Sequence, residues 1–312
     1  MCIHRMIIRS FLTVLLLTAA SLRAQAVQYA YTTYALGESA FSAGLTPPPG
    51  IYVSTVIGTY DGKLAGTADF GGVTINAGAK ADIFTTALNL LYVPDRKFLG
   101  GNLGLSITVP SGWVDYRAGV EVQSQGFSRD ASGWGMADVI PRVQLGWQRG
   151  DLSYTVYLEG ITASGRWQPG FTPIVSLHRQ GIDTGGAFTW TDKQTKLQVS
   201  GTAGFTFNFE NPQSNYQSGN EFHFEWAAGF ECVSGLVIGL VGYDYWQLNG
   251  DSGSGDKVGP FIGSLNAIGP GLSYTTIIDK RPVTFNLRYY HDYDFDNHFH
   301  GDTTFGSVTV RF

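Results

Sequence analysis

The feature that most constrains the fold of this chain is an alternation of apolar and polar residues. In residues 283–295, one set of alternate positions carries Val283, Phe285, Leu287, Tyr289, Tyr293 and Phe295, and the other carries Thr284, Asn286, Arg288, Tyr290, Asp292 and Asp294. Successive side chains of an extended strand point to opposite faces, so this segment predicts a strand with one apolar and one polar face. Segments of this kind fill the chain. They predict an all-β fold, a transmembrane antiparallel β-barrel with lipid outside and a polar lumen inside.

The spacing of these segments predicts about twelve strands, an even number as in other bacterial outer-membrane barrels. Their predicted ranges are 51–60, 82–93, 102–110, 136–148, 152–163, 184–190, 196–209, 220–232, 236–248, 266–277, 283–293 and 303–312. The connections alternate between long ones (61–81, 111–135, 164–183, 210–219, 249–265, 294–302) and short ones (94–101, 149–151, 191–195, 233–235, 278–282). In outer-membrane barrels the short turns are periplasmic and the long loops extracellular. We therefore expect residues 51–312 to form one barrel with both ends on the periplasmic side.

Residues 1–24 have the composition of a cleaved signal peptide. Arg5 and Arg9 give a basic start, and residues 11–20 (FLTVLLLTAA) form an apolar core that is too short to span a bilayer as a helix. Removing this segment leaves 17 of the 20 basic residues against 25 acidic ones, an excess of negative charge that argues against a nucleic-acid partner. It also leaves Cys232 as the single cysteine, so no internal disulfide is expected.

Residues 25–50 precede the first predicted strand and contain the run Pro47-Pro48-Pro49. Proline lacks a backbone donor and fixes φ, so this run fits neither a helix nor a central strand. The preceding residues carry an apolar set, Tyr29, Tyr31, Tyr34, Leu36, Phe41 and Leu45. We expect part of residues 29–46 to lie in the periplasmic mouth of the barrel as a plug-like segment. The alternative is a disordered leader, which is common at a mature terminus.

The chain ends on an alternating segment whose last residue is Phe312. We expect this segment to close the barrel by pairing with the first strand, because an open edge in lipid leaves backbone groups unpaired. A terminal aromatic residue of this kind also predicts recognition by the barrel-insertion machinery. Aromatic residues near the strand ends are expected to form interfacial girdles: Tyr92, Trp147, Trp190, Tyr243, Tyr245 and Tyr289.

The polar face of the predicted strands supplies candidates that line the lumen. Those with polar or charged groups are Arg142, Glu159, His223, Glu225, Glu231, Asp244 and Arg288, and those with apolar surface are Tyr157, Ile238 and Leu240. Twelve strands leave an interior that side chains largely fill. This mixed lining favours a narrow path for small, partly apolar solutes.

No pattern in the sequence predicts catalysis, a cofactor or a metal site. The densest group of potential ligands is His291, Asp292, Asp294, Asp296, His298, His300 and Asp302. Such side chains can hold a divalent metal, but an H-x-x-x-H spacing is missing and an acidic extracellular loop explains the group. His223 shares a face with Glu221 and Glu225, yet the G-x-S-x-G elbow of hydrolases is absent from the sequence. We therefore do not expect an enzyme.

Several ordered motifs resemble the family of meta-pathway phenol-degradation proteins. The first is residues 37–50 (GESAFSAGLTPPPG), and the second is residues 87–93 (ALNLLYV) followed by 97–102 (KFLGGN). Further matches are residues 207–212 (FNFENP) with 216–223 (YQSGNEFH), and 251–259 (DSGSGDKVG) with 267–270 (AIGP). The resemblance spans residues 37–312. It implies an outer-membrane barrel connected with the catabolism of aromatic compounds and related in kind to hydrocarbon and fatty-acid channels.

Together these features predict a porin-like transporter in the outer membrane of a Gram-negative cell. The expected role is passive uptake of small hydrophobic or aromatic compounds. The expected partners are the lipid bilayer, lipopolysaccharide, the insertion machinery and the solute. The alternative is a barrel with a structural or lipid-modifying, hydrolase-like role and no transport.

Overall fold

The computed structural model describes residues 32–70, 73–122, 125–167, 175–256, 260 and 262–312. The predicted signal peptide, residues 1–24, lies outside this part of the chain. Within it the chain forms strands joined by turns and loops, and no described helix is long and apolar enough to cross a membrane. The strands are β1 (Gly50–Phe70), β2 (Val73–Val93), β3 (Asn102–Val122), β4 (Gln125–Met136), β5 (Ile140–Arg149), β6 (Leu152–Ile161), β7 (Gly181–Thr191), β8 (Leu197–Asn208), β9 (Glu221–Val233), β10 (Leu236–Gln247), β11 (Ser264–Ile278), β12 (Arg281–Asp296) and β13 (His300–Arg311).

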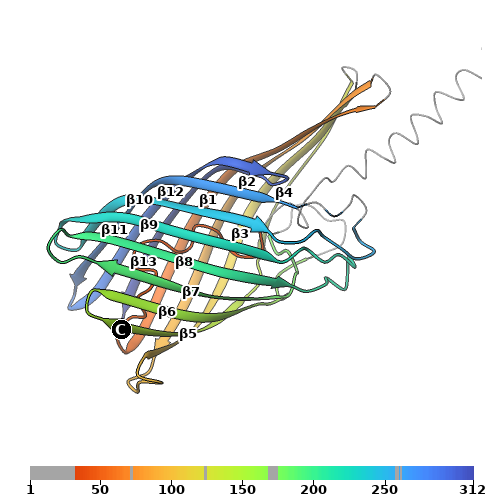
Figure 1. The fold of residues 1–312 in the computed structure, drawn as a ribbon. Coiled ribbons are helices and arrows are strands. Elements are labelled where there is room, and N and C mark those ends of the chain that lie inside the picture. The colour runs from red at the N-terminus through yellow and green to blue at the C-terminus, as the bar shows by residue number, and fades with distance from the viewer. Residues whose placement is uncertain (1–31, 71–72, 123–124, 168–174, 257–259, 261) are drawn as a thin grey trace, which may run out of the picture.

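Twelve of these strands form a closed antiparallel barrel (Figure 1). Their hydrogen-bonded order is β2-β1-β13-β12-β11-β10-β9-β8-β7-β6-β5-β3, and β2 also pairs with β3, which closes the ring. The last strand β13 pairs with the first, from Tyr52 opposite Arg311 to Lys63 opposite His300. The sequence prediction of a twelve-stranded barrel closed by the terminal segment is confirmed.

The strand β4 is an addition that the sequence did not predict. It pairs with β3 from Ser111 onward, beyond the stretch Asn102–Thr108 in which β3 pairs with β5. Residues 137–139 separate β4 from β5, so the predicted strand 136–148 corresponds to β5, and only its first residue, Met136, belongs to β4.

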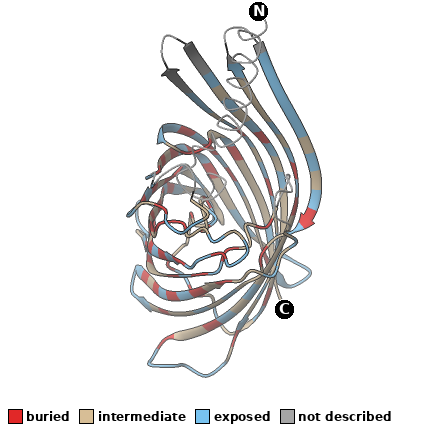
Figure 2. Ribbon diagram, turned by 90° about the vertical axis from the view of Figure 1, so that its right-hand side faces the viewer, coloured by how far each residue is buried: buried red, intermediate tan, exposed pale blue. Residues whose placement is uncertain are grey.

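Two of the predicted long loops, 61–81 and 111–135, were also assigned wrongly. Most of their residues belong to strands, because β1, β2 and β3 continue well past the ring and β4 joins them (Figures 1 and 2). Segment 61–81 is rich in glycine and alanine, and its few larger apolar residues (Leu64, Phe70, Val73 and Ile75) do not fall on one set of alternate positions, so its alternation is weak. The strand conformation of these residues is stabilised by hydrogen bonding to the neighbouring strands, because their own strand propensity is weak.

The outward face of the ring carries the apolar residues that the alternation predicted. Aromatic side chains stack near the long-loop end, where the Phe222 ring lies 4.9 Å from Phe205 and 5.8 Å from Trp246. At the short-turn end Trp147 stacks on Tyr154 at 5.3 Å. Such belts at both ends are typical of outer-membrane barrels. The girdle prediction is wrong for Tyr243 and Tyr245, which face inward and are buried.

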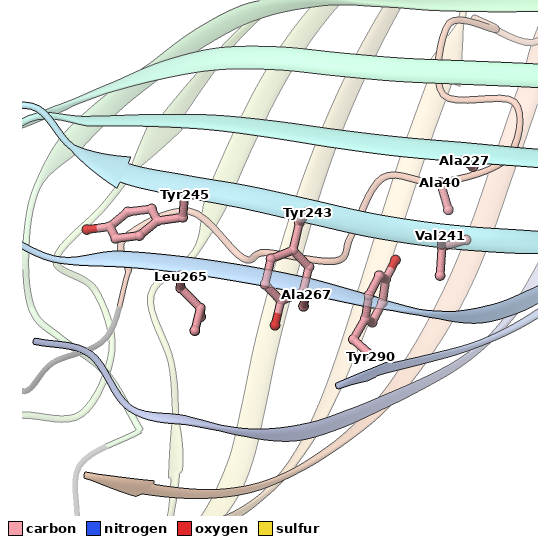
Figure 3. Packing of buried hydrophobic residues seen from close by; sticks show 8 residues of the cluster. All are labelled: Ala40, Ala227, Val241, Tyr243, Tyr245, Leu265, Ala267 and Tyr290. Carbon is pink, nitrogen blue, oxygen red and sulfur yellow. The ribbon is translucent and has the colours of Figure 1, made fainter. Parts of the chain in front are cut away.

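The inward face of β9–β12 holds a hydrophobic cluster (Figure 3). Its buried members are Ala40, Ala227, Val241, Tyr243, Tyr245, Leu265, Ala267 and Tyr290, with Leu36, Phe41 and Phe305 packed against them. Ala40, Leu36 and Phe41 come from the segment that precedes β1. Apolar surface of that segment is therefore buried against the inner wall of the barrel.

Candidate functional site

The interior of the barrel is occupied along one wall by residues 32–49, which we call the luminal segment. At the short-turn end, Asn102 at the start of β3 donates to the Pro47 carbonyl at 3.1 Å, and Gln144 on β5 donates to Thr46 Oγ1 at 3.0 Å. At the long-loop end, Thr33 Oγ1 donates to Asn208 Oδ1, at the end of β8, at 2.7 Å. The luminal segment therefore runs from one end of the barrel to the other.

Backbone groups of the luminal segment bond to inward-facing side chains along this course. The N–H of Gly44 donates to Thr189 Oγ1 on β7 at 2.9 Å, and that of Ser42 donates to Gln198 Oε1 on β8 at 3.0 Å. Further along, the N–H of Ser39 donates to Glu225 Oε2 on β9 at 2.8 Å. On the opposite side, Arg288 Nη1 on β12 donates to the Glu38 carbonyl at 2.5 Å. These bonds satisfy backbone groups that would otherwise be buried without partners.

A buried polar cluster surrounds the far end of the luminal segment. The Tyr34 ring stacks on His223 with 3.7 Å between ring centroids, and His223 Nε2 lies 3.0 Å from Asp183 Oδ2. Thr206 Oγ1 donates to the same carboxylate oxygen at 2.6 Å. The carboxylate that pairs with His223 comes from β7, two strands away, and not from Glu221 or Glu225 on its own strand. Asp183 was not a candidate from the sequence, although it follows the inward alternation of β7.

A second cluster with charged side chains lies on the inward face of β5 and β6. Arg142 Nη1 lies 3.5 Å from Glu159 Oε2, and the Arg142 guanidinium carbon sits 4.0 Å above the Tyr157 ring. Tyr157 and Glu159 are buried. Arg142 is only partly exposed, and its carboxylate and aromatic neighbours compensate for the hydration that it loses.

The structure places the ten predicted lumen residues in three groups. Six of them face inward on this occupied wall: Arg142, Tyr157, Glu159, His223, Glu225 and Arg288. Glu231 lies at the short-turn end, where it accepts from the Gly235 N–H at 2.8 Å and pairs with Lys196 at 3.2 Å.

The lumen prediction is wrong for Ile238, Leu240 and Asp244, which lie on the outward face of β10. Val241 on the same strand is fully buried opposite Ala227, and this register turns the even-numbered positions outward. Ile238 and Leu240 are 41% and 51% exposed there. The error arose because both faces of β10 carry apolar residues, so alternation alone does not distinguish inside from outside.

The remaining wall of the lumen is formed by β13, β1, β2 and β3, and its side chains differ in size and charge from those of the wall that contacts the luminal segment. At its centre the inward positions are small and neutral: Ser54, Val56, Thr85, Ala87, Asn89, Ser106, Thr108 and Ser307. Tyr52, Phe305 and Arg311 lie beside them on the same face. The small neutral positions are all partly exposed, whereas the corresponding positions of β6–β9 are mostly buried. Cross-strand hydrogen bonds satisfy several of these side chains, such as Asn89 to Thr108 Oγ1 at 2.8 Å. We call this surface the neutral wall.

At the long-loop end, Asp251 joins two loops. Its Oδ1 accepts from the Gly219 N–H at 2.9 Å and from Gln247 Nε2 at 2.8 Å, and its Oδ2 accepts from the Tyr216 hydroxyl. Burial raises the pKa of Asp251 to about 6, and the three donors oppose that rise. These bonds join the loop between β8 and β9 to the loop between β10 and β11 at the long-loop end of the barrel.

The His/Asp group at residues 291–302 does not converge on one point. His291 Nδ1 lies 2.8 Å from Asp302 Oδ1 on the outside, whereas Asp292 accepts inward from the Tyr243 hydroxyl at 2.7 Å. His298 is buried in the loop, and burial lowers its pKa to about 4. Among the described residues, no three His, Cys, Asp or Glu side chains are grouped to hold a metal ion.

One protein family matches most of the chain. The family described as "Putative MetA-pathway of phenol degradation" matches residues 65–307. The chain belongs to this family. The resemblance in the sequence motifs is thereby confirmed. The comparison with curated proteins gave no match.

Solved structures similar to this member of the phenol-degradation family are outer-membrane barrels. An outer-membrane channel from Pseudomonas putida F1 aligns with a TM-score of 0.65 and 11% identity, covering 87% of this chain and 98% of that one. The monoaromatic hydrocarbon channel CymD aligns with a TM-score of 0.41 and 8% identity over 85% of this chain and 88% of its own. A Pseudomonas aeruginosa FadL homologue aligns with a TM-score of 0.39 and 6% identity, covering 84% of this chain and 88% of that one. The first similarity supports the barrel fold.

Proposed function

We propose that this protein is a passive outer-membrane channel for small neutral compounds that are hydrophobic or aromatic. The observation that carries the proposal is the division of the lumen into two walls. The charged residues Arg142, Glu159 and Arg288 lie on the wall that the luminal segment occupies, and Arg288 donates to the Glu38 carbonyl. The centre of the partly exposed neutral wall carries small uncharged side chains. The side chains of this lining carry no charge that would hold an ion, and cross-strand hydrogen bonds already satisfy several of its polar groups, such as Ser54 with Thr309 and Asn89 with Thr108.

Family membership and the names of similar proteins support the same solute class. The family is connected with phenol degradation, and one similar structure is described as a monoaromatic hydrocarbon channel. A catabolic pathway for such compounds needs entry across the outer membrane, which a barrel supplies. We infer an outer-membrane location with the short turns periplasmic and the long loops extracellular, as is usual for such barrels.

We also propose that the luminal segment acts as a plug that narrows the channel. Its hydrogen bonds and apolar contacts extend along β5–β9 and β12, so it occupies space that an open lumen would leave to water. The solute would then pass between this segment and the neutral wall.

The rival function is a structural or lipid-modifying role without transport. Uptake of a labelled neutral monoaromatic compound by cells that lack the gene, with and without the gene restored, separates the two. Restored cells are expected to take up the compound faster at low external concentration. Equal uptake across a panel of aromatic compounds would contradict the channel and favour the structural role.

A further inference from the structure

The luminal segment is held near the long-loop end by an aromatic ring. Tyr34 is only 2% exposed, although the next residue, Ala35, is exposed. Among the described residues, the backbone groups of Tyr34, Ala35 and Leu36 form no hydrogen bond with a strand, whereas the N–H groups of Thr33 and Ser39 on either side donate to glutamates of β9. A stretch of chain that one side chain holds can leave its place when another molecule takes the place of that side chain.

One face of the Tyr34 ring lies on His223, which the barrel wall holds in place. The two rings stack with 3.7 Å between their centroids and 11° between their planes. His223 Nε2 lies 3.0 Å from Asp183 Oδ2 on β7, and a Cβ on Gly204 of β8 would lie 2.5 Å from the same nitrogen. The imidazole is thus fixed by neighbouring strands and offers a flat stacking surface to a single aromatic ring.

The Tyr34 hydroxyl lies among polar groups. It is hydrogen-bonded to the Glu225 carboxylate. The other groups that act on it electrostatically are Tyr157, Glu38 and Arg142. Glu225 Oε2 also accepts from the Ser39 N–H at 2.8 Å, while Glu225 Oε1 is buried without a hydrogen-bond partner in the described part of the chain. A ring without a hydroxyl would leave this buried carboxylate short of donors, which costs more than a lost contact.

The Tyr34 side chain is itself a phenol, with one ring and one hydroxyl opposite the point of attachment. We propose that the place of this side chain is a binding site for a monocyclic phenol that enters from the long-loop end, and that Tyr34 occupies the site until the solute displaces it. The proposal rests on the channel function given above and names the solute class, phenols in preference to hydrocarbons of the same size. Displacement would release residues 34–36 from the wall and widen the path.

The test measures binding of 4-fluorophenol and 4-fluorotoluene to the detergent-folded full-length protein by fluorine NMR. The two probes have nearly the same shape, and a methyl group in the second replaces the hydroxyl of the first. Tyr34→Ala removes the competing ring, so it should bind 4-fluorophenol at least about tenfold more tightly than the wild type does. The same variant should bind 4-fluorophenol at least about tenfold more tightly than 4-fluorotoluene, because only the phenol supplies a donor to Glu225.

The matched control is Phe41→Ala, which removes another ring of the luminal segment. Phe41 packs against the hydrophobic cluster of β9–β12, where a Cβ on Gly229 would lie 2.7 Å from Phe41 Cε1. The space that it leaves should bind 4-fluorotoluene at least as tightly as 4-fluorophenol. Circular dichroism confirms that each variant is folded.

A conservative variant, Tyr34→Phe, keeps the ring and tests the proposal even if Tyr34→Ala does not fold. It removes the hydroxyl of the resident ring and so weakens its hold on the site. Tyr34→Phe should therefore bind 4-fluorophenol about fivefold more tightly than the wild type.

Three outcomes would overturn the proposal. The first is equal affinity of folded Tyr34→Ala for the two probes, and the second is equal affinity of wild type and Tyr34→Phe for 4-fluorophenol. The third is a preference for 4-fluorophenol in Phe41→Ala as large as in Tyr34→Ala, because the selectivity would then not belong to this site.

Flux of a neutral aromatic compound into proteoliposomes of the wild type tests the channel function separately. Flux without selective phenol binding would refute the site and leave the channel. Selective phenol binding without flux of any aromatic compound would refute the channel and leave the site.

Discussion

Replacement of Gly44 by alanine tests whether the luminal segment restricts the channel. Gly44 packs directly on the backbone of β7. A Cβ at this position would lie 2.4 Å from the Phe188 carbonyl carbon and 2.5 Å from both Phe188 Cα and the Thr189 nitrogen. Carbon atoms in contact need about 3.5 Å, so the luminal segment would have to move away from the wall by about 1 Å. The strand cannot yield instead, because β7 is paired on both sides with β6 and β8.

The loss of docking free energy in Gly44→Ala can be estimated from the contacts that such a movement breaks. The Gly44 N–H donates to Thr189 Oγ1 at 2.9 Å, and Thr155 Oγ1 donates to the Gly44 carbonyl at 3.0 Å. Both would lengthen past the range of a hydrogen bond, at a cost of about 0.5–1.5 kcal/mol each. Overpacking adds about 1–3 kcal/mol. We expect the free energy that docks the segment to fall by at least about 2 kcal/mol, which raises the ratio of released to docked segment at least about 25-fold.

The assay is flux of a neutral aromatic compound into proteoliposomes, together with protease cleavage of the luminal segment in the folded protein. Gly44→Ala should increase both, while the melting temperature of the barrel measured by circular dichroism stays close to that of the wild type. The matched control is Gly306→Ala on β13, where an added Cβ meets nothing within 4 Å. Unchanged flux and unchanged cleavage in Gly44→Ala, with a folded barrel, would refute the reasoning.

Two further predictions concern the long-loop end and the chain terminus. Burial raises the pKa of Asp251 to about 6, above the value of about 3.9 for an unfolded chain, so its contribution to stability is fully present below pH 4 and is lost as pH rises through 6. Asp251→Asn should remove this part of the pH dependence in thermal unfolding between pH 4 and 7, and an identical pH profile for the variant would disprove the assignment. Phe312 is 59% exposed, with the Arg281 guanidinium carbon 4.4 Å above its ring, so its side chain contributes little packing inside the barrel. Phe312→Ala should therefore reduce insertion into the outer membrane of cells without changing refolding in detergent, and equal amounts of wild type and variant in isolated outer membranes would count against a recognition role.

The alternation in the sequence was sufficient to predict the barrel, because lipid outside and a filled lumen inside require opposite faces of each strand to differ. It was insufficient where both faces are apolar, as on β10, where Leu240 faces outward and Val241 inward. It also missed the extension of β1–β4, since glycine and alanine at residues 62–66 carry no alternation strong enough to distinguish a strand from a loop.

The candidate site was predictable only in part. Inward charges such as Arg142 and Glu159 followed from strand parity. The pairing of His223 with Asp183 did not, because Asp183 lies on a strand 40 residues earlier in the chain and only the barrel places the two side chains together. The course of residues 32–49 depends on contacts with strands β5–β9 and β12, none of which can be deduced from the segment itself.

The central claim is that a neutral aromatic solute passes along the neutral wall, and a pair of adjacent substitutions on β2 tests it most directly. Ala87 faces inward between Val56 and Pro110, whereas its neighbour Leu88 faces outward and is 53% exposed. Flux of a neutral monoaromatic compound into proteoliposomes should fall several-fold for Ala87→Trp, since the indole fills the path, and should stay at the wild-type rate for Leu88→Trp. Equal flux for wild type, Ala87→Trp and Leu88→Trp, with all three folded, would contradict the account.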